Sequence, residues 1–466
     1  VSGREHLGKY ALSEAGKILD FESKYFAIPY LGKKMDMIAV PEFSAGAMEN
    51  VGAVIFKDDA LLFDQKTGSS FQKQRITGII AHEFAHQWFG DLVTMNWWDD
   101  LWLNEAFATW FTRKVENHLH PEWRVMDESV YSRFGAMGTD ALKSSRAIHA
   151  EVNNASQAVE MFDGITYQRG SAVLRMLELF VGENAFQKGI SKYLRRHQFA
   201  NAEAEDFWTA IARESNGAPV SEIMESFVLQ PGYPQLNIKV LPQGKALEIT
   251  QWRQLRLGRD FKDPSVWKVP LVIRDLSGKS PGAESGESQQ VCVLLKERKE
   301  QFALDLGGKL PLLNAGGMGY YRSCYEPAYL KNLQRHFSEL SAPEKLTLIS
   351  DCSSLVLPGD LPVENLYDFV NLLEFEDDPM VMGDLAGIVF NPHEFMLEKG
   401  QAEYAAFVQK IFLPLKAKVK GWQAKDSDSQ QMRSLRGSVL EGLGTFGQDK
   451  KTINEAFALF EKYKKD

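Results

Sequence analysis

The segment His82-Glu83-Phe84-Ala85-His86 places two imidazoles and a carboxylate at a spacing that suits a metal site. Residues four apart on a helix lie on one face, about one turn from each other, so both histidines can reach a single ion. Glu83, next to the first histidine, is placed to take a proton from water at that site. Zinc is the ion that this motif binds in hydrolases.

A catalytic zinc normally has three protein ligands plus water, so the two histidines leave one protein ligand to be found. Glu105, in the segment Asn104-Glu105-Ala106, is the best candidate. The sequence therefore predicts a zinc hydrolase that binds one ion through His82, His86 and Glu105 and uses Glu83 as its general base.

Two helices must position these side chains. Apolar residues spaced by three, four and eight predict a largely buried helix over 71–90 that ends at Gly90. A second helix is predicted over 101–115, with Glu105 in its first turns. Because charged groups inside buried helices are costly without a partner, an ion explains them better than a polar helix face that matches the motif by chance.

The composition is that of an ordinary soluble globular protein. The 466 residues are 44% hydrophobic and 25% charged, which allows about three domains. The net charge of -9 gives no basic patch for nucleic acid. No apolar run approaches a membrane span, and no signal-peptide core is present in the first twenty residues. The three cysteines are too scattered for a disulfide framework but leave one disulfide open: Cys292, Cys324 and Cys352.

The hydrophobic pattern divides the chain into three parts. Residues 1–234 are mainly helical, with strand-like runs at 35–40 and 53–56. Residues 235–325 alternate with a period of two, which predicts the strands of a small β-sandwich, and the stretch 277–288 has the composition of an exposed loop.

The last part, residues 326–466, is helical again. Pro, Gly, Asn and Asp residues break it at 358–360, 377–379 and 391–392. Short helices between such breaks predict paired helices of a solenoid, although no sequence repeat of fixed period is obvious.

Three segments, in order along the chain, resemble the gluzincin zinc aminopeptidases, which include aminopeptidase N, puromycin-sensitive aminopeptidase and the bifunctional leukotriene hydrolase. Gly46-Ala47-Met48-Glu49-Asn50 is similar to the exopeptidase motif of that family. His82 to His86 with Glu105 is similar to its zinc motif, and Ile165 to Gly170 to the segment of its catalytic tyrosine. The segment from Asn314 to Arg322 looks like the strand that closes the family's β-sandwich.

The resemblance implies a multidomain α+β fold with three parts. These are a thermolysin-like, mainly helical catalytic domain, a small β-sandwich and an α-helical, solenoid-like C-terminal part. It also implies that an N-terminal domain and part of the C-terminal domain are absent, and Val1 in place of an initiator methionine favours a processed or cut chain.

The five residues from Gly46 to Asn50 are predicted to bind the substrate. A carboxylate at a fixed distance from the metal can pair with a free α-ammonium, which gives Glu49 the role of a ruler. The small side chains of Gly46 and Ala47 let an extended peptide lie against the backbone, and Met48 supplies an apolar wall. By resemblance, Tyr167 donates a hydrogen bond to the developing oxyanion.

We therefore expect a zinc aminopeptidase that acts on peptides with a free N-terminus, without a nucleic acid partner. The competing interpretations are an endopeptidase or an epoxide hydrolase with the same ligands, and a non-catalytic peptide-binding scaffold. Asp91 is a candidate acceptor for one zinc histidine. The sequence favours a soluble, cytoplasmic protein slightly and gives no oligomeric state.

Overall fold

The computed structural model describes residues 3–276, 290–304, 310–390, 400–425 and 427–465. The chain divides into two compact units, Val1–Tyr329 and Leu330–Asp466. Helices predominate and the sheets are small, which confirms the mixed, multidomain α+β class. The thermolysin-like domain, the β-sandwich, the solenoid and the boundaries at 234 and 325 stay predictions.

The first unit begins with a helix and a three-stranded sheet. Helix α1 (Lys9–Phe26) precedes the strands β1 (Asp36–Val40), β2 (Ala47–Met48) and β3 (Ala53–Lys57). The order is β1-β3-β2, with β1 parallel and β2 antiparallel to β3. The two strand-like runs at 35–40 and 53–56 are therefore strands, and part of the Gly46–Asn50 segment forms a third strand at one edge.

Two helices carry the metal motif. Helix α2 (Ser70–Ala85) is capped by Ser69, whose side chain accepts a hydrogen bond from the Gln72 N–H at 3.1 Å. Helix α3 spans Trp102–Leu119. The prediction that the first helix continues to Gly90 was wrong, because α2 ends at Ala85 and residues 86–88 form turns. The turn buries its apolar side chains as a helix would, so hydrophobic periodicity extends past the helix end.

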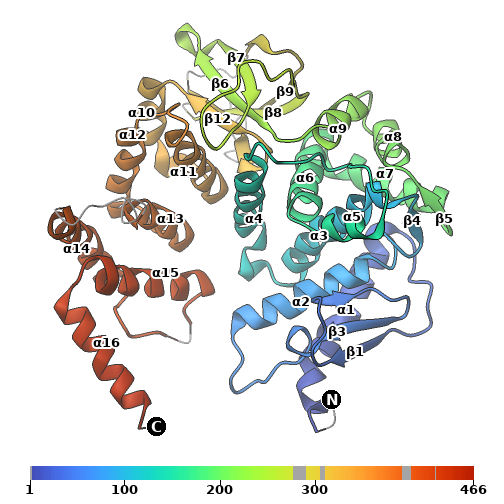
Figure 1. Ribbon diagram of the computed structural model, residues 1–466, viewed down its shortest axis with the longest axis horizontal. Helices are drawn as coiled ribbons and strands as arrows, with labels where there is room; N and C mark the ends of the chain where they lie inside the picture. The colour runs from blue at the N-terminus through green and yellow to red at the C-terminus, as the bar shows by residue number, and fades with distance from the viewer. Residues whose placement is uncertain (1–2, 277–289, 305–309, 391–399, 426, 466) are drawn as a thin grey trace, which may run out of the picture. The chain divides into compact units, whose positions relative to one another are not determined.

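Helix α3 lies between α2 and α6 (Gly170–Val181) in the first unit (Figure 1). Two glycines allow this close packing. A Cβ at Gly78 of α2 would lie 2.7 Å from Glu116 Oε1, and one at Gly170 would lie 2.5 Å from the Cβ of Ala106. Phe89 and Phe107 stack between these elements with ring centroids 3.3 Å apart. A tightly packed helical core therefore surrounds the histidine motif.

The remaining helices of this unit complete that core. A π-helical turn, Ile165–Arg169, leads directly into α6, and the strands β4 (Val93–Met95) and β5 (Ala200–Ala202) pair in parallel. The other helices are α4 (Val125–Asp140), α5 (Ala155–Glu160), α7 (Glu183–His197), α8 (Ala204–Glu214) and α9 (Val220–Val228).

Two small sheets follow α9, in orders β10-β7-β6-β12 and β11-β8-β9. The period-two segments of 235–325 form strands as predicted, but the segment 314–322 becomes a strand only at Arg322, where β12 pairs in parallel with β6. The predicted loop at 277–288 lies outside the described residues. The strands are β6 (Pro234–Val240), β7 (Ala246–Arg253), β8 (Val269–Asp275), β9 (Gln290–Leu295), β10 (Lys299–Ala303), β11 (Pro311–Leu313) and β12 (Arg322–Tyr325).

The second unit is helical. The predicted breaks at 358–360 and 377–379 lie between helices, and the break at 391–392 falls outside the described residues. Helix α10 begins at Pro327, just before the unit boundary. The helices are α10 (Pro327–Arg335), α11 (Ala342–Val356), α12 (Val363–Tyr367), α13 (Pro379–Phe390), α14 (Gln401–Lys418), α15 (Gln430–Glu441) and α16 (Lys450–Tyr463).

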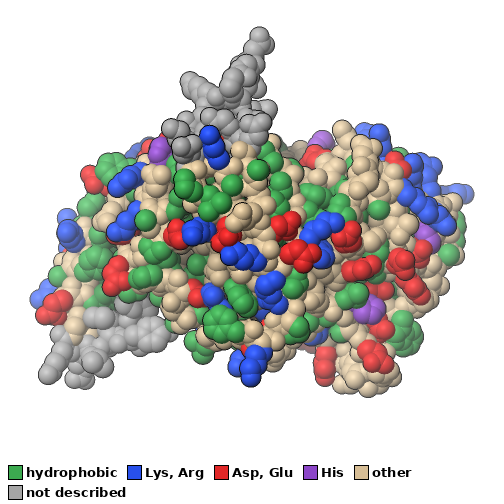
Figure 2. Space-filling view, turned by 90° about the horizontal axis from the view of Figure 1, so that it is seen from above, with side chains coloured by type: hydrophobic (Ala, Val, Ile, Leu, Met, Phe, Trp, Pro, Cys, Tyr) green, Lys and Arg blue, Asp and Glu red, His purple; other side chains and the backbone are tan. Residues whose placement is uncertain are grey.

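Charges of both signs are interspersed with apolar side chains on the face drawn in Figure 2. Across the described residues, no helix combines the length and the apolar character that crossing a membrane requires. None of the three cysteines forms a disulfide in the structure: Cys292, Cys324 and Cys352.

Candidate metal centre

His82, His86 and Glu105 converge at the packed faces of α2 and α3. Glu105 Oε2 lies 3.2 Å from His82 Nε2 and 3.3 Å from His86 Nε2, and the two imidazole nitrogens are 3.1 Å apart. His86 and Glu105 are buried, while His82 keeps 19% of its side chain exposed. Within the described part of the chain, these three residues form the one group of histidine, cysteine or acidic side chains that could hold a metal ion.

These separations fit a single tetrahedral ion. Nitrogen and oxygen ligands that lie about 2.1 Å from one zinc ion are about 3.4 Å from each other at tetrahedral angles. The three observed separations, 3.1 to 3.3 Å, are close to that value. The residues present therefore fit a zinc ion.

The second nitrogen of His86 has its own partner. His86 Nδ1 lies 2.9 Å from the carbonyl oxygen of Phe89, an arrangement in which Nδ1–H donates and Nε2 is left for a metal. The turn after Ala85 supplies this carbonyl. The candidate acceptor Asp91 does not hold this ring, which corrects the sequence expectation as far as His86 is concerned.

The charged side chains of the centre shift one another's pKa values. Burial would raise the pKa of Glu105, but the two histidines lower it below its ordinary range. Burial would lower the pKa of His86, yet the Glu105 and Glu49 carboxylates outweigh burial and raise it to about 10. Burial lowers the pKa of His82. The Glu105 carboxylate thus stays ionised, which is the form that a metal ligand needs.

Glu83 is buried beside the centre. Burial, with smaller contributions from the charges of Glu49 and Glu105, raises its pKa to about 8. A carboxylate with a pKa near neutrality can both accept and release a proton under working conditions. Its position next to His82 on the helix was evident from the sequence, whereas its burial depends on the surrounding elements.

A glutamine that the sequence reasoning missed holds the Gly46–Asn50 segment against α2. Gln87 Nε2 donates to the Glu49 carbonyl oxygen at 3.0 Å, and Gln87 Oε1 accepts from the Gly52 N–H at 3.3 Å. Gln87 directly follows the second histidine, so these contacts bring the backbone of Glu49 to the histidine end of α2. The sequence shows Gln87 directly after the motif, but no local sequence pattern indicates that it contacts Glu49 and Gly52.

Tyr167 lies beside two of the candidate ligands, His82 and Glu105. It belongs to the π-helical turn that Gly170 brings against α3, and its ring stacks on the His82 ring at a centroid distance of 6.1 Å. Burial, followed by the charge of Glu105, raises the pKa of its hydroxyl far above the ordinary value. The phenol therefore keeps its proton and can donate a hydrogen bond.

Comparison with known proteins places this centre in a family. Residues 10–227 match the model of the peptidase family M1 domain. Residues 310–466 match that of the ERAP1-like C-terminal domain. The first match contains each residue that the sequence singled out for chemistry.

Relatives match along the whole chain. It is 34% identical to aminopeptidase M1 of Arabidopsis thaliana, over 100% of this chain and 53% of that protein. It is 33% identical to aminopeptidase 2 of Candida albicans, over 98% of this chain and 49% of that protein. The tricorn protease-interacting factor F2 of Thermoplasma acidophilum is also 33% identical, with coverage of 95% and 53%.

The chain spans about half the length of these relatives. Identity of about one third extends over nearly all of its residues, and two family models match in order along the one chain. The chain belongs to the peptidase M1 family.

Proposed function

We propose that this protein is a zinc-dependent aminopeptidase that removes N-terminal residues from peptides. The observation that carries the proposal is the convergence of His82, His86 and Glu105 at separations that fit one zinc ion. Membership of the peptidase M1 family and relatives named as aminopeptidases support the same activity.

His82, His86 and Glu105 would hold the ion. Zinc, when bound, polarises the scissile carbonyl and makes water at the site more acidic. The Phe89 carbonyl keeps the His86 ring in the orientation and tautomer that a ligand needs.

Glu83 acts as the general base. It takes a proton from the attacking water and delivers that proton to the leaving amine. Its carboxylate must be ionised to begin, and positive charge at the neighbouring ligands would lower its pKa from the value of about 8 that burial produces. Because burial raises the pKa of Glu83, the carboxylate can take a proton from water, and the protonated side chain can give that proton to the leaving amine.

Glu49 binds the free α-ammonium of the substrate. The charge of its carboxylate raises the pKa of both Glu83 and His86, so it acts on the same site. Gln87 fixes its backbone, which sets the distance between the bound ammonium and the scissile bond. The N-terminal end of the peptide then lies along a wall that is formed by four neighbours of Glu49: Gly46, Ala47, Met48 and Asn50.

Tyr167 donates a hydrogen bond to the oxygen of the scissile carbonyl as negative charge develops there. Its raised pKa keeps it a donor at every working pH. Stacking on His82 holds the phenol beside the ligand set, where the proposed oxyanion forms.

Two measurements test the proposal together. Metal analysis of the purified chain should find about one zinc per chain, and aminoacyl fluorogenic amides should be hydrolysed. Removal of the metal with a chelator should abolish turnover, and added zinc should restore it. If the chain binds zinc but cleaves no substrate with a free amine, the aminopeptidase proposal fails and a peptide-binding scaffold is the interpretation that remains.

The choice of substrate separates an aminopeptidase from an endopeptidase and from an epoxide hydrolase. An endopeptidase would cleave N-acetylated peptides as well as free ones, and an epoxide hydrolase would open a lipid epoxide. We expect N-acetylation to reduce kcat/KM by at least about tenfold, because Glu49 then loses its charged partner. Equal rates on free and acetylated peptides would contradict the aminopeptidase proposal.

A further inference from the structure

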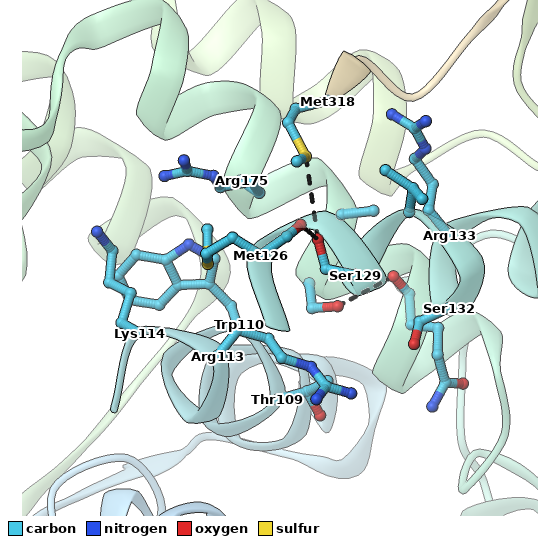
Figure 3. A pocket seen from close by; sticks show the side chains of 14 residues that line it. Thr109, Trp110, Arg113, Lys114, Met126, Ser129, Ser132, Arg133, Arg175 and Met318 are labelled. Carbon is cyan, nitrogen blue, oxygen red and sulfur yellow. Dashed lines mark hydrogen bonds between the residues drawn. The ribbon is translucent and has the colours of Figure 1, made fainter. Parts of the chain in front are cut away.

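Two pockets border the π-helical turn that holds Tyr167. The first holds about 90 Å³ and is lined mainly by residues of α3, α4 and α6, with Gln168 of the turn among them (Figure 3). Each of the four cations in its wall has a partner. The pairs are Arg113 with Glu116, Lys114 and Arg175 with Glu178, and Arg133 with the carbonyls of Gly317 and Gly319. None of these partners belongs to the turn, so these pairs do not tie it in place.

The second pocket borders an ion pair that does reach the turn. It holds about 380 Å³, and its lining includes Arg146, Asp163 and Ile165, the first residue of the turn. Arg146 Nη2 lies 2.6 Å from Asp163 Oδ1, and the two side chains are 25% and 40% exposed. The pair is therefore open to solvent on the side of this pocket.

Asp163 caps the start of the turn. Its Oδ1 accepts hydrogen bonds from the N–H groups of Ile165 and Thr166 at 2.9 and 3.0 Å, and its carbonyl oxygen accepts from the Tyr167 N–H at 3.1 Å. The first N–H groups of a helical segment have no partner within it, and a carboxylate in front of the segment satisfies them. The backbone of Tyr167 is thus fixed through one aspartate.

Arg146 fixes that aspartate from the loop after α4. Besides Asp163, Nη2 lies 2.8 Å from the Thr166 hydroxyl and 3.2 Å from the carbonyl oxygen of Met161, at the end of α5. Nη1 donates to two backbone carbonyls of its own loop, at 2.8 and 3.2 Å. One planar guanidinium therefore joins three segments: its loop, the end of α5 and the start of the turn.

The Tyr167 ring is only partly enclosed by its neighbours. It lies beside the rings of His82 and Phe162, at centroid distances of 6.1 and 6.4 Å, and Phe162 is itself 47% exposed. The place of the hydroxyl therefore depends on the backbone of the turn as well as on ring packing. A displacement of about 1 Å at a catalytic group can cost about 10²-fold in rate.

We propose that Arg146 is a positioning residue for Tyr167. The inference rests on the proposed function, because it takes the tyrosine hydroxyl to donate to the developing oxyanion. Arg146 acts through Asp163 and Thr166, which set the backbone of the turn. Loss of the guanidinium should lower kcat and leave KM nearly unchanged, because the hydrogen bond that it positions is made in the transition state.

The first test is kinetic. Arg146→Gln should lower kcat about tenfold and change KM by less than about twofold. Arg124→Gln is the matched control, since it removes a similar pair at the start of α4, where Arg124 and Asp127 are 2.8 Å apart and 33% and 28% exposed. It should change neither constant. An unchanged kcat in Arg146→Gln, or the same loss in Arg124→Gln, would overturn the proposal.

Two milder variants test the same contacts if Arg146→Gln folds poorly. Thr166→Val keeps the shape of a fully buried side chain and removes the hydroxyl that Arg146 contacts. It should lower kcat about two- to threefold. Arg146→Lys keeps the charge beside Asp163 but lacks the planar fork, so its kcat should lie between those of Arg146→Gln and the unmodified chain. A normal kcat in both variants would also overturn the proposal.

A double-mutant cycle distinguishes positioning of Tyr167 from a general effect on the structure. In a chain that already carries Tyr167→Phe, Arg146→Gln should change kcat by less than about twofold, because the hydroxyl that it positions is gone. Urea unfolding of the four chains accompanies the cycle, since a folding defect would lower activity in both backgrounds alike. Losses of kcat that multiply would show that Arg146 supports the site by another route, and would refute the proposal.

The pocket beside Arg146 allows a chemical rescue. Arg146→Ala removes the guanidinium next to a pocket of about 380 Å³ and leaves Asp163 accessible to a small cation. Ethylguanidinium at about 50 mM should restore at least about a third of the lost kcat, since it can pair with the same carboxylate. Sodium chloride at the same ionic strength should not. An equal response to the two salts would count against the proposal.

A measurement without turnover separates this proposal from the proposed function. A fluorinated tyrosine replaces Tyr167 alone, and its fluorine NMR signal is recorded in the otherwise unmodified chain, with Arg146→Gln and with Arg124→Gln. The signal should shift or broaden with Arg146→Gln only. That change, with no peptidase activity in the unmodified chain, would refute the aminopeptidase and retain the positioning role. Turnover with the same signal and the same kcat in all chains would refute the positioning role and retain the aminopeptidase.

Discussion

The first unit contains two buried clusters of charge that are built in opposite ways. At the first, Arg169 and Asp140, both fully buried, pair at 3.1 Å. Arg169 Nη2 also donates to the carbonyls of Phe227 and Gln230, and Asp140 accepts from the Gly232 N–H and from the Tyr320 hydroxyl. We call this the Arg169–Asp140 cluster. Both terminal nitrogens of Arg169 meet acceptors, and only its Nε is buried without a hydrogen-bond partner, so the protein itself compensates the charge.

The metal centre is the second cluster. Two imidazoles and a carboxylate point their ligand atoms at one another, and a further buried carboxylate, Glu83, stands beside them with a pKa of about 8. An added cation would complete this set, whereas it would disrupt the Arg169–Asp140 cluster. Burial of charge therefore does not mark a functional site; the direction in which the buried groups point does.

The metal centre also depends on the Arg169–Asp140 cluster. Arg169 is the last residue of the π-helical turn that holds Tyr167. By fixing that turn to the ends of α4 and α9, the Arg169–Asp140 cluster positions a group of the metal centre without touching it. If the proposed function holds, the Arg169–Asp140 cluster serves stability and the metal centre serves chemistry, and substitutions should separate these effects.

The largest expected effect is on activity, at Glu83. Glu83→Gln should lower kcat/KM by about 10² to 10⁴-fold, the range for a general base, while zinc content and unfolding free energy stay near those of the unmodified chain. Steady-state kinetics, metal analysis and urea unfolding measure the three quantities. Glu225→Gln, at an exposed position of α9, is the matched control and should change none of them. Loss of zinc in Glu83→Gln would contradict the role of base.

The next largest effect is on stability, at Arg169. Arg169→Met keeps much of the side-chain volume but leaves Asp140 buried without its cation, which typically costs about 3 to 5 kcal/mol. Urea unfolding should show this loss, and Arg196→Met on the exposed face of α7 should change stability by less than about 0.5 kcal/mol. A loss below about 1 kcal/mol in Arg169→Met would remove the contrast between the two clusters.

The sequence predicted which metal-ligating side chains lie together better than it predicted the contacts that support them. The spacing of His82 and His86 and the periodicity around them indicated a helix with both imidazoles on one face, and the structure brings Glu105 to them. The end of that helix was misplaced because Trp88 and Phe89 are buried in a turn as they would be in a helix. Periodicity reports burial, and it does not distinguish the two.

The supporting contacts join residues that no local pattern connects. Gln87 holds Glu49 from 38 residues away, and Arg169 meets Asp140 from 29 residues away. Tyr167 was singled out by resemblance alone, since its neighbourhood of His82 and Glu105 exists only after α6 has packed on α3.

Tyr167 should show an intermediate effect and sharpens the comparison from the side of the metal centre. Tyr167→Phe removes one hydroxyl that the proposed mechanism uses only in the transition state, so kcat should fall by about 10² to 10³-fold with little change in KM. The Arg169–Asp140 cluster should be unaffected, and the midpoint of urea unfolding should stay within error. A kcat near that of the unmodified chain would remove the tyrosine from the mechanism.

The smallest effect is expected at the pair of His149 and Asp100, which is partly exposed to solvent and belongs to neither buried cluster. His149 Nδ1 and Asp100 Oδ1 are 2.8 Å apart, and 37% of the histidine side chain is exposed. The hydrogen bond to Asp100 raises the pKa of His149, with smaller contributions from the charges of Asp99 and Glu203 and opposition from burial. Folding thus favours the protonated imidazole, but solvent screens the pair.

The sign of the pH dependence follows from that raised pKa. The pair contributes fully below the unfolded pKa of about 6.5, and its contribution is lost as pH rises through the higher pKa of the folded state. His149→Gln should therefore lower the unfolding free energy by at most about 1 kcal/mol near pH 5.5 and by nearly nothing at pH 9. Urea unfolding of both chains across this range measures the difference. A difference that is constant with pH would mean that packing, and not the ion pair with Asp100, stabilises His149. Pairing of opposite charges would then stabilise the buried Arg169–Asp140 cluster but not this partly exposed pair.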